Sequence, residues 1–142
     1  KLQLLENRAD EAQARFEIVI KGGDSPLARN PTGRPVLVEA KLGSAQTLLK
    51  LGRVQEARGL MEDLATQRQD DPVVMLWLGK SEEAASDVSN AEQHYRDAIR
   101  LDPKSFIGYM ALAELFFAAS RPNDAAIVLD QARKEVADGV TV

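Results

Sequence analysis

The stretch Ala91–Pro103, AEQHYRDAIRLDP, decides the fold of this 142-residue chain. Within it Ala91, Tyr95 and Ala98 fall at i, i+4 and i+7, so they share one face of a predicted helix. Two very small side chains beside one large ring indicate a helix packed close to a neighbour, with the ring filling the space between them. Pro103 disfavours helical geometry at the residue before it and lacks an N–H, so the helix is expected to end there.

The pattern of this stretch returns at intervals of 34 residues. Five series of positions keep the interval: three in the helices equivalent to this one, one in the helices that precede them, and one at the turns between paired helices. The series are Ala57, Ala91 and Ala125; Met61, Tyr95 and Leu129; Leu64, Ala98 and Ala132; Ala45, Gly79 and Ala113; and Gly52, Ser86 and Ser120. Five series in one register indicate an internal repeat built from a helical hairpin.

Helical periodicity covers most of the chain, and no segment alternates apolar and polar residues as a strand does. The predicted fold class is therefore all-α. Helices are expected over residues 36–51, 54–67, 73–85, 88–101, 106–119 and 122–136, after two helical segments within residues 1–21. Residues 22–35 hold three glycines and three prolines, which predict a loop inserted between two helices.

A helix–turn–helix unit of 34 residues with these landmarks resembles the tetratricopeptide repeat. The unit at residues 72–105 carries the family's landmarks most fully, at Leu78, Gly79, Ala91, Tyr95, Ala98 and Pro103. The resemblance implies a right-handed α-solenoid of antiparallel helix pairs with about three and a half repeats. These would be a partial unit at residues 1–21, an inserted loop at 22–37, and repeats at 38–71, 72–105 and 106–139.

The composition limits the functions that this fold serves. The chain is 44% hydrophobic and 28% charged, with a net charge of −4. This mild acidity argues against binding to nucleic acid or to an anionic membrane, because both need a surplus of Lys and Arg. No apolar run approaches the roughly 20 residues that span a bilayer, so no direct membrane insertion is expected. The chain is interpreted as a soluble domain, either on its own or within a larger protein, and its compartment, cytoplasmic or periplasmic, is left open.

Catalysis and metal binding find little support in the sequence. The chain has no cysteine and one histidine, so it has few means of building a zinc site or a His-based catalytic triad. We therefore expect no enzyme activity, no metal and no cofactor. His94 is expected to be partly exposed with no partner, and Glu82 and Glu83 are expected to be solvated.

In the tetratricopeptide family the first helices of successive units line a concave groove that binds protein segments. The resemblance thus implies a non-catalytic scaffold that binds a protein or peptide partner. The groove residues that it implies are Leu42, Gln46, Leu49, Lys50, Val74, Trp77, Lys80, Ile107, Met110, Glu114 and Phe117. Trp77, Met110 and Phe117 are expected to supply apolar contacts. Lys80 and Glu114 are 34 residues apart, and they either neutralise each other or set the polarity of the bound segment.

Two alternatives remain open. The chain is either a slice of a longer solenoid or a module that self-associates through its terminal helices, because repeat units bury their faces against neighbours. The apolar residues expected to make such contacts are Leu2, Leu4, Leu5, Ile127 and Val128. An RNA-binding helical repeat, like those of the pentatricopeptide family, is the third reading, and the acidic charge and the 34-residue register count against it.

Overall fold

The computed structural model describes residues 35–138, and this range contains six α-helices. They are α2 (Val36–Lys50), α3 (Val54–Gln67), α4 (Pro72–Ala84), α5 (Val88–Leu101), α6 (Phe106–Ala118) and α7 (Pro122–Asp138). Each boundary lies within two residues of its predicted position, and the all-α fold class is confirmed. The partial unit predicted at 1–21 and residues 22–34 of the loop predicted at 22–37 lie outside the described residues, whereas residues 36–37 belong to α2.

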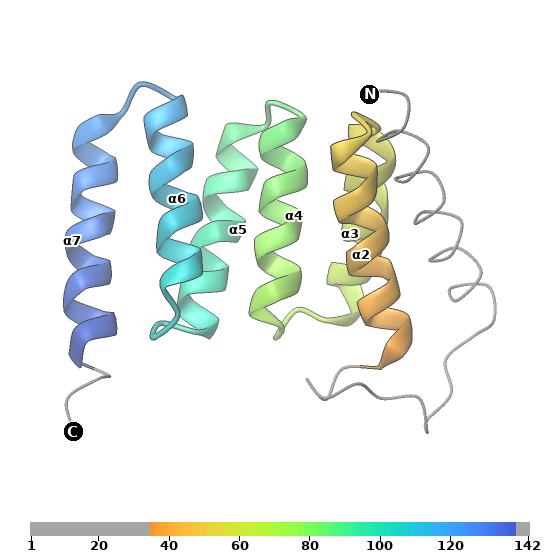
Figure 1. Ribbon diagram of the computed structural model, residues 1–142, viewed down its shortest axis with the longest axis horizontal. Coiled ribbons are helices and arrows are strands. Elements are labelled where there is room, and N and C mark those ends of the chain that lie inside the picture. The colour runs from red at the N-terminus through yellow and green to blue at the C-terminus, as the bar shows by residue number, and fades with distance from the viewer. Residues whose placement is uncertain (1–34, 139–142) are drawn as a thin grey trace, which may run out of the picture. The chain divides into compact units, whose positions relative to one another are not determined.

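The helices belong to two compact units, residues 1–67 and residues 68–142. In the first unit, the described helices α2 and α3 pack as a pair. In the second unit, α4 packs on α5, α6 packs on α7, and α5 packs on α6 (Figure 1). Helix α4 also contacts α6 directly, although α5 separates them in the sequence. The second unit therefore brings the first helices of two successive repeats side by side.

The turns within the three pairs share one backbone conformation. Gly52, Ser86 and Ser120 have φ angles of 78°, 64° and 60°, in the left-handed region that ends helices. In each turn the N–H of the next residue donates to the carbonyl five residues before it. These bonds run from Arg53 to Leu48 at 2.9 Å, from Asp87 to Glu82 at 2.8 Å, and from Arg121 to Phe116 at 2.7 Å. The 34-residue period of the sequence is thus also a period of backbone geometry.

Ser86→Gly is expected to stabilise the protein by about 0.5–1 kcal/mol. A residue with a Cβ is strained in the left-handed region, and glycine removes this strain at a smaller cost in chain entropy. Ser89→Gly, within α5, is the matched control and should lose about 0.5 kcal/mol, because glycine is a poorer helix former than serine. Urea unfolding followed by circular dichroism measures both changes, and a less stable Ser86→Gly protein would count against this explanation of the turn.

The core of the second unit is centred on Tyr95, which is fully buried between small residues. Ala91 and Ala98, one turn to either side, are also buried, as the opening pattern predicts. On α4 the Tyr95 ring faces Gly79, where an added Cβ would stand 2.6 Å from the ring. The equivalent residue on α7, Leu129, is only half-buried. The packing predicted from the sequence is therefore realised most fully in the repeat at residues 72–105.

Candidate functional site

The groove residues predicted on α6 form an exposed, largely apolar row. Ile107, Met110, Glu114 and Phe117 are spaced so that they lie on one side of the helix. Ile107 is 61% exposed, Met110 40% and Phe117 55%. Large apolar side chains that are exposed next to one another are typical of a surface that another molecule covers.

Helix α4 contributes a second row next to the first. Val73, Trp77 and Lys80 fall at i, i+4 and i+7 on this helix, and all three are half-buried. Val73 was not singled out from the sequence, although its helical spacing from Trp77 is the signal that finds it. We call the two rows together the α4–α6 face, which comprises Val73, Trp77, Lys80, Ile107, Met110, Glu114 and Phe117.

The charges on the α4–α6 face do not cancel each other. The ammonium of Lys80 lies 5.4 Å from the centroid of the Trp77 ring, a cation–π contact. Within the described part of the chain no ion pair joins Lys80 and Glu114, and the Glu114 side chain is exposed on α6. Lys80 and Glu114 were predicted either to neutralise each other or to set the polarity of the bound segment. The described contacts do not include the ion pair that mutual neutralisation requires.

A second carboxylate, that of Glu83, lies in the last turn of α4. The Tyr95 hydroxyl, which reaches from α5, donates to Glu83 Oε1 at 2.8 Å. Burial raises the pKa of Tyr95 well above its ordinary value, and the nearby charges of Glu83, Glu114 and Glu82 raise it further. Glu83 is half-buried rather than solvated as expected. The C-terminal end of the α4–α6 face therefore carries two carboxylates, those of Glu83 and Glu114, and one ammonium, that of Lys80.

The other end of the α4–α6 face holds a shallow notch of about 50 Å³. Three groups of residues line it: Pro72, Val73 and Leu76 on α4, Ile107 and Gly108 on α6, and Ala98, Asp102 and Ser105 at the end of α5 and in the turn after it. Most of these side chains are apolar, so the notch suits an apolar group. Because Ile107 also belongs to the exposed row, the notch and the row form one continuous surface.

The remaining predicted groove residues are placed differently. Lys50 is exposed on α2, and Gln46 and Leu49 are half-buried on the same helix. This row belongs to the first unit, so its alignment with α4 and α6 stays a prediction. Leu42 on α2 and Val74 on α4 are buried core residues and are not part of an exposed row.

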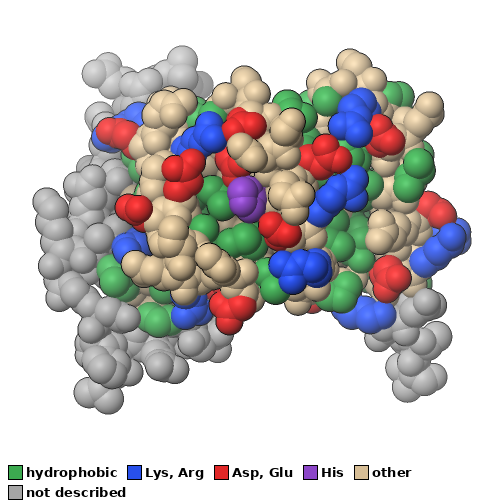
Figure 2. Space-filling model, turned by 180° about the vertical axis from the view of Figure 1, so that it is seen from behind, with side chains coloured by type: hydrophobic (Ala, Val, Ile, Leu, Met, Phe, Trp, Pro, Cys, Tyr) green, Lys and Arg blue, Asp and Glu red, His purple; other side chains and the backbone are tan. Residues whose placement is uncertain are grey.

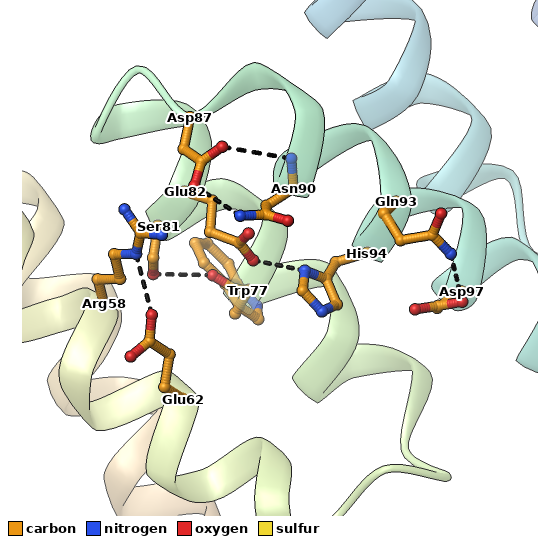
Figure 3. Close-up of polar contacts among 10 residues, drawn as sticks. All are labelled: Arg58, Glu62, Trp77, Ser81, Glu82, Asp87, Asn90, Gln93, His94 and Asp97. Atoms are coloured by element: carbon orange, nitrogen blue, oxygen red, sulfur yellow. Dashed lines mark hydrogen bonds and ion pairs between the residues drawn. The ribbon is translucent and has the colours of Figure 1, made fainter.

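Glu82 and His94 form a pair that sequence reasoning missed. Glu82, expected to be solvated, has a side chain only 3% exposed, and its carboxylate contacts His94 Nδ1 (Figure 3). His94 is 27% exposed, as a partly exposed histidine was expected to be, but it has this partner. The pair joins α4 to α5 through residues 12 positions apart, which form no recognisable motif. The expectation that His94 lacks a partner is therefore wrong.

The surface around His94 has mixed charge. Figure 2 shows the protein from the side opposite to Figure 1, and the single histidine of the sequence appears there in purple. Acidic and basic side chains are interspersed over this side. Several are paired within their own helix, including Arg96 with Glu92 at 3.1 Å and Arg133 with Asp130 at 3.0 Å. Ion pairs of this exposed kind contribute little to stability or specificity.

The terminal helix α7 presents one of the two apolar residues expected to mediate self-association. Ile127 is 66% exposed. Val128, its predicted companion, is buried, because its side chain points into the protein rather than to the surface. The expectation that both residues form an exposed contact is wrong for Val128. Leu2, Leu4 and Leu5 lie outside the described residues.

Membrane spans and metal clusters are both missing from the part of the chain that the structure describes. Among residues 35–138, no helix combines the length and apolar character needed to cross a membrane. Over the same range, no three His, Cys, Asp or Glu side chains gather closely enough to hold a metal ion.

Comparison with solved structures places the fold among repeat proteins. MamA from Desulfovibrio magneticus RS-1 superimposes with a TM-score of 0.73 at 17% identity, over 96% of this chain and 70% of that one. TTC0263, a thermophilic tetratricopeptide repeat protein of Thermus thermophilus, gives a TM-score of 0.70 at 21% identity, over 94% of this chain and 70% of that one. The third structure is the type III secretion chaperone SycD of Yersinia enterocolitica, in complex with a peptide of the translocator YopD. It gives a TM-score of 0.64 at 19% identity, over 76% of this chain and 82% of that one.

Sequence comparison identifies the repeat itself. No curated protein sequence matches this chain. The sequence profile of the tetratricopeptide repeat, however, matches residues 3–72 and 76–140, which together make up most of the chain. This match agrees with the 34-residue register, with the helix pairs and with the solved structures of similar fold. The chain belongs to the tetratricopeptide repeat family.

Proposed function

We propose that this chain is a non-catalytic module that binds a segment of a protein partner on the α4–α6 face. The exposure of Ile107, Met110 and Phe117 along one side of α6 carries the proposal. Such a continuous apolar row favours burial against another protein. Trp77, on the adjacent helix, belongs to the residue type most enriched where binding energy concentrates in interfaces.

A protein of similar fold supports this proposal. SycD has been solved in complex with a peptide of YopD, so a helical array of this kind accommodates a peptide segment. The identity between SycD and this chain is 19%, so the comparison supports a mode of binding and not a shared partner.

A non-catalytic role fits the contacts around the carboxylate–imidazole pair of the described residues. Glu82 and His94 form a carboxylate–imidazole pair, and Ser81 precedes Glu82 in the sequence. The Ser81 hydroxyl is buried and donates to the carbonyl of Trp77 at 2.9 Å (Figure 3), so it is engaged within its own helix. A nucleophile would need to reach the imidazole to be activated.

Photocrosslinking tests the proposed surface. A photoreactive benzoylphenylalanine in place of Phe117 is expected to give a covalent adduct with another protein in cells that make this chain naturally. Met110→Ser, about two helical turns away in the same row of α6, should reduce the adduct strongly, because it removes apolar contact area from the same surface. Ile127→Ser is the matched control, since Ile127 is also an exposed apolar residue but lies on α7, and it should leave the yield unchanged.

Two results would contradict the proposal. An adduct with a second copy of this chain, lost in Ile127→Ser, would favour the self-associating module instead. An adduct yield that is the same in Met110→Ser as in the parent would show that the contact at position 117 does not depend on the α4–α6 face. All of the substituted residues are exposed, so each variant is expected to keep the parent's circular dichroism spectrum.

A further inference from the structure

We infer that the segment bound on the α4–α6 face is both basic and apolar: it places an apolar side chain in the notch and a Lys or Arg side chain against Glu83 and Glu114. This inference rests on the proposed function and names the chemistry of the partner. Three features of the second unit support it, namely the notch, the position of the carboxylates and the ends of the two helices.

The notch selects an apolar group at the N-terminal ends of α4 and α6. Its walls are mostly hydrocarbon, and its volume of about 50 Å³ suits the end of one aliphatic side chain. Ile107 forms one wall and is 61% exposed, so an inserted side chain would cover it. Burying this apolar surface contributes about 25 cal/mol for each Å² removed from water.

The carboxylates select a cation at the opposite end. Glu83 accepts a hydrogen bond from the Tyr95 hydroxyl at 2.8 Å, and Glu114 is exposed on α6, which contacts α4 directly. The nearest cation on the same face, Lys80, lies over the Trp77 ring. Neither carboxylate has a cationic partner among the described contacts of this unit, so a Lys or Arg from the partner would supply the missing positive charge.

The ends of the two helices add to this preference. The C-terminus of a helix carries a partial negative charge, which basic residues in the last turn usually balance. Helices α4 and α6 have no basic residue in their last turns, whereas α2 has Lys50 and α5 has Arg100 there. Glu83 lies in the last turn of α4, so its charge and the helix dipole have the same sign. The charge of Glu83 and the dipole of α4 therefore both favour a cation from the partner at this end.

The distance between the two features predicts a spacing in the partner. Seven residues of α6 separate Ile107 at the notch from Glu114, which corresponds to about 10 Å along the helix. An extended segment covers this distance in about three residues, and a helical segment in about seven. The partner is expected to carry its apolar and basic side chains at one of these two spacings.

Selection from a display library of random 12-residue peptides tests the inference and does not require the natural partner to be identified. Peptides that bind the parent protein but not Phe117→Ser are retained, because they use the α4–α6 face. These peptides are expected to be enriched in an apolar residue followed or preceded, at one of the two spacings, by Lys or Arg. The single tryptophan of the chain, Trp77, reports their binding by fluorescence.

Charge variants then separate the inference from the proposed function. Glu114→Gln should weaken the selected peptides roughly two- to fivefold, and Glu114→Lys should weaken them further. Gln131→Lys on α7 makes the same unit change in net charge as Glu114→Gln and should leave the affinity unchanged. Added salt should reduce the affinity of the parent more than that of Glu114→Gln.

Peptides that require Phe117 but are acidic or uncharged, or that bind Glu114→Gln as tightly as the parent, would overturn the inference and leave the proposed function standing. If every binder is instead indifferent to Phe117→Ser, both the inference and the proposed function are contradicted.

Discussion

Tyr95→Ala is expected to lower the free energy of unfolding by about 3–5 kcal/mol, the range found when a large buried aromatic side chain is truncated. Tyr95 is fully buried, and its ring lies against Gly79 of the neighbouring helix. Its removal leaves a cavity, because α4 and α5 are already in close contact and cannot move together to fill the space. Because domains of this size are stable by about 5–15 kcal/mol, the variant would lose a large share of its stability.

Tyr95→Phe separates the ring from the hydroxyl. It keeps the packing and loses only the hydrogen bond to Glu83, so the expected loss is about 0.5–1.5 kcal/mol. Urea unfolding followed by Trp77 fluorescence measures both variants within the same unit. A Tyr95→Ala protein as stable as the parent, or as stable as Tyr95→Phe, would contradict the central role of this ring.

Gly79→Ala is the second substitution expected to have a large effect, although alanine is the better helix former. The new Cβ would stand 2.6 Å and 2.7 Å from two carbons of the Tyr95 ring, and 3.3 Å from the carbonyl oxygen of Ala91. The ring is buried and bonded to Glu83, so α4 and α5 must move apart. We expect this overpacking to cost about 1–3 kcal/mol, partly offset by up to about 1 kcal/mol of helix propensity.

Gly59→Ala provides a control of opposite sign. Gly59 lies within α3, and a Cβ there would meet nothing within 4 Å. Helix propensity alone then applies, and the variant should be more stable by up to about 1 kcal/mol. The urea midpoint, measured by circular dichroism, should fall for Gly79→Ala and rise for Gly59→Ala. A rise for both would show that the contact between Gly79 and Tyr95 does not limit the approach of the two helices.

The fold was predictable because the same pattern of small residues, apolar residues and turn residues recurs in each repeat. Ala57, Ala91 and Ala125 are all buried, and the three equivalent turns share a left-handed residue. A single helix boundary is a weak signal, but recurrence at a fixed interval makes each boundary support the others. Helix propensity, turn chemistry and burial pattern agree at these positions, which is what allows a sequence to specify one structure.

The polar contacts of the candidate site were less predictable, because they depend on side-chain direction and not on periodicity. Lys80 and Glu114 share a register, yet the flexible stem of Lys80 places its ammonium over Trp77. Glu82 occupies a position where the family usually has an aromatic residue, and it is buried because α5 brings His94 to it. Neither contact follows from the spacing of residues along one helix.

Adjacent apolar residues that look equivalent in the sequence also differ in burial. Ile127 and Val128 are adjacent apolar residues on one helix, but they point in directions about 100° apart, so one is exposed and the other is buried. The same rule explains why Val74 is buried while its neighbour Val73 lines the notch. Exposed and supporting residues of the site can therefore be told apart only once the orientation of each helix is known.

Binding of a partner segment on the α4–α6 face of this tetratricopeptide repeat protein is tested most directly by nuclear magnetic resonance. The titrant is the partner segment recovered by crosslinking from position 117, and the signals are the Trp77 indole N–H and the methyl groups of Met110 and Ile127. We predict that the Trp77 and Met110 signals shift and saturate together, while the Ile127 signal stays in place. A shift confined to Ile127, with Trp77 and Met110 unchanged, would contradict binding on this face.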